Sequence, residues 1–187
     1  MTRLVSTITA FLLSLFLSQP LIANNLHSSD QAEVYELGSV KIIDPWLKSQ
    51  IGGAHKAKLF FEYRNDAQLS ERLVSVSSPL ARGETRFIVV GSASKQRTLS
   101  EAEVINFPGG SSSYELSEIG HYVELSGLQI PILMGKRIPV TLTFKNAGSI
   151  TIDIAARFHS PKLTRRIKEA AAAGDIEALN ALRPLPQ

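Results

Sequence analysis

The chain contains no cysteine and only two methionines in 187 residues. Without thiols it cannot form disulfides, cysteine-ligated zinc or iron–sulfur sites, a cysteine nucleophile or a blue-copper centre, which needs a thiolate. Histidine is also scarce, with four residues. The soft donors from which a transition-metal site could be built are therefore few.

The chain also lacks a strong charge of one sign and the motifs of common catalytic centres. Twenty Lys and Arg residues oppose 17 Asp and Glu residues, a net charge of +3, which is too balanced to indicate a nucleic-acid-binding protein. No Gly-x-Ser-x-Gly, phosphate-binding glycine loop or His-Glu-x-x-His occurs. We therefore expect a protein that is not an enzyme and has no nucleic-acid partner.

An apolar run from Leu4 to Leu17 follows the basic residue Arg3. Its length suits the core of a signal peptide and is short for a membrane span, which needs about 20 residues. With Pro20 and Ala23 after the run, residues 1–23 are expected to be a signal peptide that exports the protein to the periplasm. An uncleaved membrane anchor is the alternative, and the absence of cysteine excludes the acylated lipoprotein route.

After a polar, flexible lead over residues 24–36, an all-β domain is expected over residues 37–158. Its apolar and polar residues alternate with a period of two, as in strands with one face in a core, and about eight such runs occur. Short strands without crossover helices predict an antiparallel β-sandwich or small barrel. Lys145–Gly148 fits a hairpin turn between the last two strands.

Residues 159–187 have the pattern of a short helical tail. Pro161 can begin one helix and Gly174 can end it, while Asp175 is suited to cap a second. The start of the tail carries a basic cluster, formed by Lys162, Arg165, Arg166 and Lys168. The tail could pack on the sandwich, or the cluster could dock on an acidic partner or an anionic membrane surface. A third interpretation is that the basic cluster forms a solvent-exposed helix face without a partner.

Six segments form a moderately specific pattern when they are taken in order along the chain. They are Asp44–Lys48, Gly52-Gly53, Tyr63–Asn65, Arg72–Ala81, Gly127-Leu128 and Ile138–Phe144 followed by Ala147-Gly148. Together they resemble the PCu(A)C family of periplasmic copper chaperones over residues 40–154. The resemblance implies a cupredoxin-like β-sandwich that holds Cu(I) with His and Met and delivers it toward cytochrome oxidase assembly, with an assembly protein or oxidase subunit as partner.

The first two ligand positions that this resemblance implies do not carry ligands. Cu(I) prefers thioether and imidazole donors. Counting from Pro79, the first His position falls at or near Phe87. The following loop, Gly91 to Ser100, should supply a Met and contains none.

The family's His-x-Met pair can be placed in two ways. Aligned without a gap on Gly127-Leu128, it falls on Tyr122 and Glu124; shifted by one residue, it falls on His121 and Val123. In either case at most one soft donor remains, which makes His121 the single candidate metal ligand.

The other soft donors show no close spacing that would make a pair; they are His27, His55, Met134 and His159. Two functions therefore stay open. The chain is either an exported copper chaperone-like protein with a degenerate copper site, or a ligand-free member of the family. In the second case it acts as a periplasmic adaptor through its sandwich and basic tail.

Overall fold

The structure is a computed structural model that describes residues 31–48, 55–93 and 96–182. The expected signal peptide over residues 1–23 and the first part of the expected lead lie outside these ranges. Within the described part, neither helix is long and apolar enough to cross a membrane.

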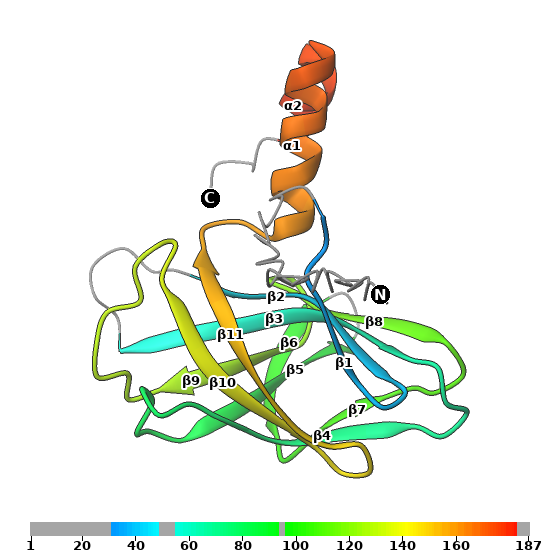
Figure 1. The fold of residues 1–187 in the computed structure, drawn as a ribbon, viewed down its shortest axis with the longest axis vertical. Helices are drawn as coiled ribbons and strands as arrows, with labels where there is room; N and C mark the ends of the chain where they lie inside the picture. Colours follow the sequence, from blue (N-terminus) through cyan, green and yellow to red (C-terminus); the bar gives the residue numbers. More distant parts are fainter. Residues whose placement is uncertain (1–30, 49–54, 94–95, 183–187) are drawn as a thin grey trace, which may run out of the picture.

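Eleven strands in the described residues form one sheet that curls around a core into a nearly closed barrel (Figure 1). The strands are β1 Val34–Leu37, β2 Val40–Lys48, β3 Lys56–Asn65, β4 Glu71–Ser77, β5 Thr85–Ala93, β6 Gln96–Ala102, β7 Ile105–Phe107, β8 Ser112–Leu116, β9 Tyr122–Ser126, β10 Arg137–Phe144 and β11 Gly148–Arg157. Their order is β6-β5-β9-β3-β2-β11-β10-β4-β7, with β1 paired to β2 and β8 to β3. The predicted all-β fold with a helical tail is confirmed.

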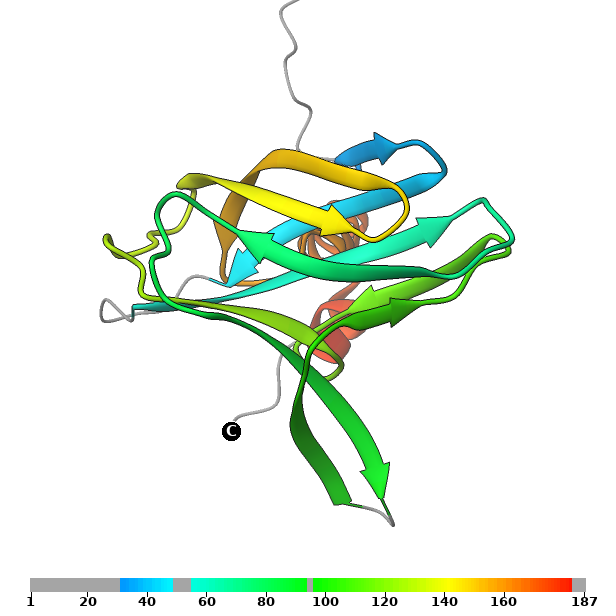
Figure 2. The ribbon, with the colours of Figure 1, turned by 90° about the horizontal axis from the view of Figure 1, so that it is seen from below.

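The sequence pattern does not predict β1, β6 or β8, so the strand count rises from about eight to eleven. β1 begins inside the expected lead, and β6 lies largely in the expected polar loop over residues 91–100. Each is paired along its length with a neighbouring strand, β1 with β2, β6 with β5 and β8 with β3. Backbone hydrogen bonds therefore hold these polar segments in the sheet. Figure 2 shows the β5–β6 hairpin projecting away from the barrel.

Pairing is antiparallel, as expected, except where β11 meets β2. There Ala155, Ala156 and Arg157 run parallel to Trp46, Leu47 and Lys48. This seam joins a strand near the start of the domain to its last strand. The predicted hairpin is also present, since β10 and β11 pair from Arg137↔Ala155 to Phe144↔Gly148.

The core is filled by alternate residues of the strands. In β3, Leu59 and Tyr63 are buried, whereas Lys58 and Glu62 are partly exposed. The Tyr63 ring stacks on Phe107 of β7 across the barrel, with ring centroids 4.0 Å apart. Such contacts between strands distant in sequence close the barrel around one apolar interior.

A second, smaller aromatic cluster contains Trp46, Phe60 and Tyr122. Phe60 lies between two residues of the main core, Leu59 and Phe61, so by strand alternation it faces the other side of the sheet. The ring centroids of Trp46 and Phe60 are 4.7 Å apart. The outer face of β2, β3 and β9 is thus partly apolar.

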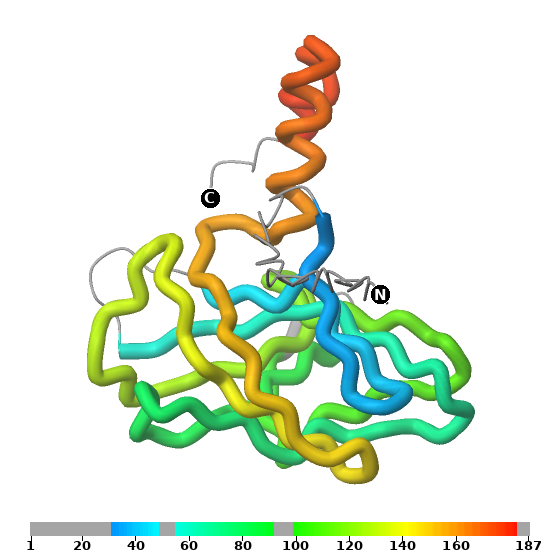
Figure 3. Tube along the Cα trace, in the orientation of Figure 1, coloured from blue at the N-terminus to red at the C-terminus, as the bar shows by residue number. Residues whose placement is uncertain are grey.

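The tail forms two helices, α1 Pro161–Ala173 and α2 Ile176–Leu182, as the sequence predicts. Ser160 caps α1, because its hydroxyl accepts a hydrogen bond from the Leu163 amide at 3.2 Å. Gly174 ends α1 with a φ of 67°, and the Asp175 carboxylate caps α2 by accepting from the Ala178 amide at 2.9 Å. The helical pair stands away from the barrel, and only the start of α1 approaches it (Figures 1 and 3).

Candidate functional site

The ligand positions implied by the family pattern lie where β5 and β9 run side by side. Phe87 pairs with Val123, and Ile88 pairs with Tyr122. Directly paired residues share a face of the sheet, so Phe87 and Val123 face the core together. The alternate residues Tyr122 and Glu124 of β9 face outward. Phe87 therefore does not converge with Tyr122 and Glu124, whereas it does share a face with Val123.

This geometry favours one of the two placements of the His-x-Met pair. By strand alternation, a pair on residues 121 and 123 lies on the same side of the sheet as Phe87, and a pair on residues 122 and 124 does not. Ligands to one ion must converge, so the placement on His121 and Val123 is the consistent one. Three implied ligand positions then share one face of the sheet: Phe87, His121 and Val123. Two of them, Phe87 and Val123, are apolar side chains buried in the core and carry no donor atom.

His121 is held by the backbone of β5. Its Nδ1 accepts a hydrogen bond from the Val90 amide at 2.7 Å, and its ring stacks on Tyr114 with centroids 5.6 Å apart. Burial lowers the pKa of His121 below its usual value, which favours the neutral ring. Because Nδ1 is the acceptor, the proton of the neutral ring lies on Nε2. Neither nitrogen of His121 then offers a free lone pair to a metal.

Tyr122 and Glu124 on the outer face are engaged with basic residues. The Lys58 ammonium lies 4.5 Å from the centroid of the Tyr122 ring, a cation–π contact. The Glu124 carboxylate accepts from Lys56 Nζ at 3.0 Å. Arg86 and Lys58 are also the strand partners of Glu124 on either side. This arrangement neutralises the carboxylate and provides no soft donor.

The residues at the implied copper position therefore do not fit Cu(I). Two positions are apolar, the one imidazole is committed to a backbone amide, and Gly91–Ser100 contains no methionine. In the described part of the chain, no group of three or more His, Asp or Glu side chains could hold a metal ion. Of the remaining soft donors, His27 lies outside the described residues, and the other three lie elsewhere in the structure. His55 donates through Nδ1 to the Leu128 carbonyl at 2.8 Å, while Met134 and His159 line a separate cavity.

Two members of the basic cluster contact the barrel. Arg165 makes a two-point ion pair with Asp44 of β2, at 2.5 and 3.2 Å. Lys162 lies 4.0 Å from the Glu115 carboxylate, with both side chains exposed. Arg166 is exposed on α1. Of the cluster Lys162, Arg165, Arg166 and Lys168, Arg165 is thus committed to attaching the tail to the barrel.

A bulge in β2 places Asp44 for this contact. Pro45 has no amide hydrogen, and the register of β2 against β3 shifts between Ile43 and Trp46. Asp44 adopts a φ of 49°, and its carboxylate also accepts from the Glu33 amide at 3.0 Å. The bulge thereby joins the start of the barrel, β2 and α1 at one point.

Sequence reasoning did not identify Glu33 as a centre of ion pairing. Its carboxylate contacts Arg137 at 3.0 Å and Arg157 at 3.4 Å, and it accepts from the Tyr35 hydroxyl at 3.1 Å. Burial alone would raise the pKa of Glu33, but the hydrogen bond and positive charge of Arg137, with Tyr35 and Arg157, outweigh it and lower the pKa. These residues are up to 124 positions apart in the sequence, so no local pattern signals the cluster.

Both the sequence and the structure of this chain are similar to those of known proteins. Residues 40–156 match the LpqE-like family, described as "Putative lipoprotein LpqE-like". Among curated proteins, none matches the chain. The structure resembles a copper-bound PCuAC domain from PmoF2 with a TM-score of 0.58 and 29% identity, covering 67% of this chain and 97% of that domain.

Two further solved structures share the fold. The apo PCuAC domain of PmoF2 is 28% identical, with a TM-score of 0.57, and covers 69% of this chain and 96% of its own. The apo DR1885 protein of Deinococcus radiodurans is 14% identical, with a TM-score of 0.50, and covers 85% of this chain and 97% of its own. The resemblance to the PCu(A)C family and the cupredoxin-like fold that it implies are confirmed. The chain belongs to the LpqE-like family and carries a PCuAC-type domain.

Proposed function

We propose that this chain is an exported protein of the bacterial envelope that acts as a binding module and carries no copper at the family position. The match to a family described as lipoproteins supports export. The absence of copper at the family position is supported by the hydrogen bond from the Val90 amide to His121 Nδ1. This bond occupies the lone pair of the one imidazole left at that position. The chain would then act by binding a partner, which is the adaptor role that the sequence leaves open beside copper delivery.

The α1–α2 pair is the element proposed to bind the partner. It stands off the barrel (Figure 3), and none of the residues of α2 is buried. Ile176, at the start of α2, is 70% exposed, so an apolar side chain is presented to solvent. Arg165 fixes the other end of α1 to Asp44 and thereby gives the arm a defined direction.

The test retrieves partners from envelope extracts with the tagged full-length chain, Ile176→Glu and the matched control Ile119→Glu. Ile119 is 79% exposed on a barrel turn, so both variants add one charge at an exposed apolar site. We expect Ile176→Glu to lose the partner and Ile119→Glu to keep it. Identical partner sets from all three proteins would contradict a role for the arm.

Copper delivery toward oxidase assembly is the second candidate function. Its support is the 29% identity to a copper-bound PCuAC domain. Competition for Cu(I) against a chromophoric chelator separates the two candidates. Under the first proposal neither the native chain nor His121→Ala withdraws copper from the chelator, whereas copper carriage requires that the native chain does so and that His121→Ala is weaker.

A further inference from the structure

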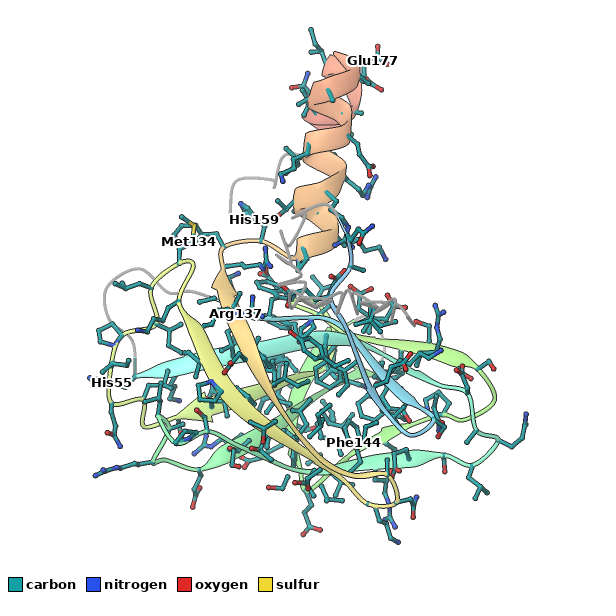
Figure 4. All side chains as sticks on the ribbon, viewed as in Figure 1. His55, Met134, Arg137, Phe144, His159 and Glu177 are labelled. Atoms are coloured by element: carbon teal, nitrogen blue, oxygen red, sulfur yellow. The ribbon has the colours of Figure 1, made fainter. Side chains whose placement is uncertain are left out.

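A cavity of about 440 Å3 opens where the barrel meets the tail. Its lining includes Met134, Arg137, Arg157, Phe158, His159 and Thr164. Figure 4 shows Met134, Arg137 and His159 near the base of the helical tail, with His55 farther along the barrel. None of the described lining residues belongs to β5 or β9, so the cavity is distinct from the position considered for copper. Its volume lies within the range of about 300–1,000 Å3 of small-molecule sites.

The lining combines apolar surface with positive charge. Met134 and Phe158 are 63% and 40% exposed, which is high for large apolar side chains. Among the lining residues that the structure describes, Arg137 and Arg157 are the charged ones, and none is Asp or Glu. An occupant that covers the apolar surface and accepts hydrogen bonds from guanidinium groups matches both features.

The two arginines differ in how fully they are engaged. Arg137 donates to Glu33, the Tyr35 hydroxyl and the Asp153 carbonyl. Arg157 has five N–H donors and makes one hydrogen bond within the described residues, to Glu33 at a long 3.4 Å. Its Nε is buried there without a partner. The Arg157 side chain is nevertheless 33% exposed, so its terminal N–H groups have capacity for a further acceptor.

The start of α1 adds a second source of positive potential. Thr164, in the first turn of α1, lines the cavity, and this turn has no acidic residue. The N-terminal end of a helix carries partial positive charge, which favours an anion nearby. His159, just before the helix, borders the same space.

We propose that this cavity binds a carboxylate that bears an apolar chain. The carboxylate accepts hydrogen bonds from Arg157, and the chain lies against Met134 and Phe158. A planar carboxylate suits a guanidinium fork, and one negative charge matches one incompletely paired arginine beside Glu33. This site is independent of the proposed partner-binding arm and of copper.

The first measurement is calorimetric titration of the purified full-length chain with decanoate and with the uncharged analogue decanol. We expect decanoate to bind with a Kd of about 100 μM or tighter, and decanol to bind at least about tenfold more weakly, because it lacks the charge that pairs with Arg157. Inorganic phosphate and decyl phosphate are titrated in parallel. Tighter binding of decyl phosphate than of decanoate would overturn the assignment to a carboxylate.

Two variants with matched controls locate the site. Arg157→Met removes the anchoring charge, and Arg166→Met removes one exposed arginine outside the cavity. Met134→Glu adds a negative charge at the mouth, and Leu133→Glu adds the same charge at the neighbouring, 68% exposed residue that does not line the cavity. We expect about tenfold weaker decanoate binding from Arg157→Met and Met134→Glu, and little change from either control.

The proposal is overturned if decanoate does not bind at millimolar concentration, or if decanol binds equally well. It is also overturned if Met134→Glu and Leu133→Glu behave alike. The Met134 pair keeps the test valid even if Arg157→Met fails to fold, because Met134 is mostly exposed and its substitution leaves the Glu33 cluster intact. Failure of this proposal would not contradict the partner-binding proposal, because the Ile176→Glu variant tests binding at the exposed surface of α2 and not at the cavity.

Discussion

At the scale of single residues, the position of the proton on the His121 ring determines whether this side chain can accept a hydrogen bond or bind a metal. The Val90 amide donates to Nδ1, and that bond requires a ring nitrogen with a free lone pair. Protonation at low pH makes Nδ1 a donor, so the two N–H groups then oppose each other. The same bond that keeps His121 from a metal also makes it sensitive to acid.

We predict that the stability of the protein falls as the pH drops below about 6.5, with His121 as one cause. The folded-state pKa of His121 is lowered by burial, so the unfolded chain binds the proton more readily. Its contribution is present above the unfolded pKa and is lost as the pH falls toward the folded value. Urea unfolding of the native chain and of His121→Gln at pH 7.5, 6.5 and 5.5 measures this.

The amide oxygen of His121→Gln can still accept from Val90 but does not titrate, so we expect a shallower fall in its unfolding free energy. His55→Gln is the control, because the Nδ1 of His55 contacts the Leu128 carbonyl and accepts no backbone amide. Equal pH dependence of the native chain and His121→Gln would contradict the prediction.

The sequence predicts the loss of copper ligands but not the placement of the His-x-Met pair. A shift of one residue along a strand moves every side chain to the other face, so residues 121 and 123 or 122 and 124 are equally regular choices. Only the pairing of Phe87 with Val123, which joins segments 36 residues apart, distinguishes them. Local periodicity carries no information on such pairing.

At the scale of elements, the β10–β11 hairpin is held by a buried carboxylate from another strand. Glu71 of β4 is 4% exposed and accepts hydrogen bonds from the amides of Arg72, Asn146 and Ala147 at 2.8–3.2 Å. The turn residues themselves predict the hairpin, whereas the role of Glu71 depends on a contact across 75 positions.

We predict that Glu71→Ala lowers the free energy of unfolding by about 3 kcal/mol, because it removes a buried carboxylate and leaves the turn amides of Asn146 and Ala147 without that acceptor. Chemical denaturation measures the loss, and Glu84→Ala, at an exposed glutamate, is the control. A loss of less than about 1 kcal/mol would show that water replaces the carboxylate at the turn.

The attachment of the tail yields a prediction for α1. Arg165→Met removes both hydrogen bonds to Asp44, so we expect amide exchange in the first turn of α1 to accelerate about tenfold while exchange in the barrel core stays unchanged. Arg166→Met, at the adjacent exposed arginine, should exchange like the native chain. Equal protection in the two variants would mean that the helix caps alone hold this turn.

Some elements follow from local sequence and others do not. The caps of both helices lie within three residues of the amides that they satisfy, so Pro161, Gly174 and Asp175 predict the tail well. β6 and β8 lack an apolar alternation because one pairs at the edge of the sheet and the other pairs only with β3. Their conformation is set by neighbours, which a single-strand pattern does not reveal.

At the scale of the whole molecule, the barrel retains the fold of the family, while its implied copper position holds one imidazole and two apolar side chains. The two placements of the His-x-Met pair can therefore be tested by introducing copper-binding side chains on one face of the sheet or on the other. Phe87→His with Val123→Met brings two donors to the face proposed to hold His121. Tyr122→His with Glu124→Met adds the same donors on the opposite face.

We predict that Cu(I) raises the thermal unfolding midpoint of the first double variant by several degrees and leaves that of the second unchanged, since only a folded-state site that converges adds binding energy to folding. Thermal melts with and without Cu(I) under reducing conditions measure the shift. A larger shift for the second double variant would reverse the assignment of faces.

The seam between β2 and β11 also gives the molecule a built-in optical reporter. Trp46, the single tryptophan of the chain, is 4% exposed, packs against the tilted ring of Phe60 and pairs with Ala155 across the parallel join. Its indole fluorescence therefore comes from one dry environment at the point where the first and last parts of the barrel meet. A red shift of that emission marks the opening of this join, so one spectrum can follow barrel closure in every variant that keeps Trp46.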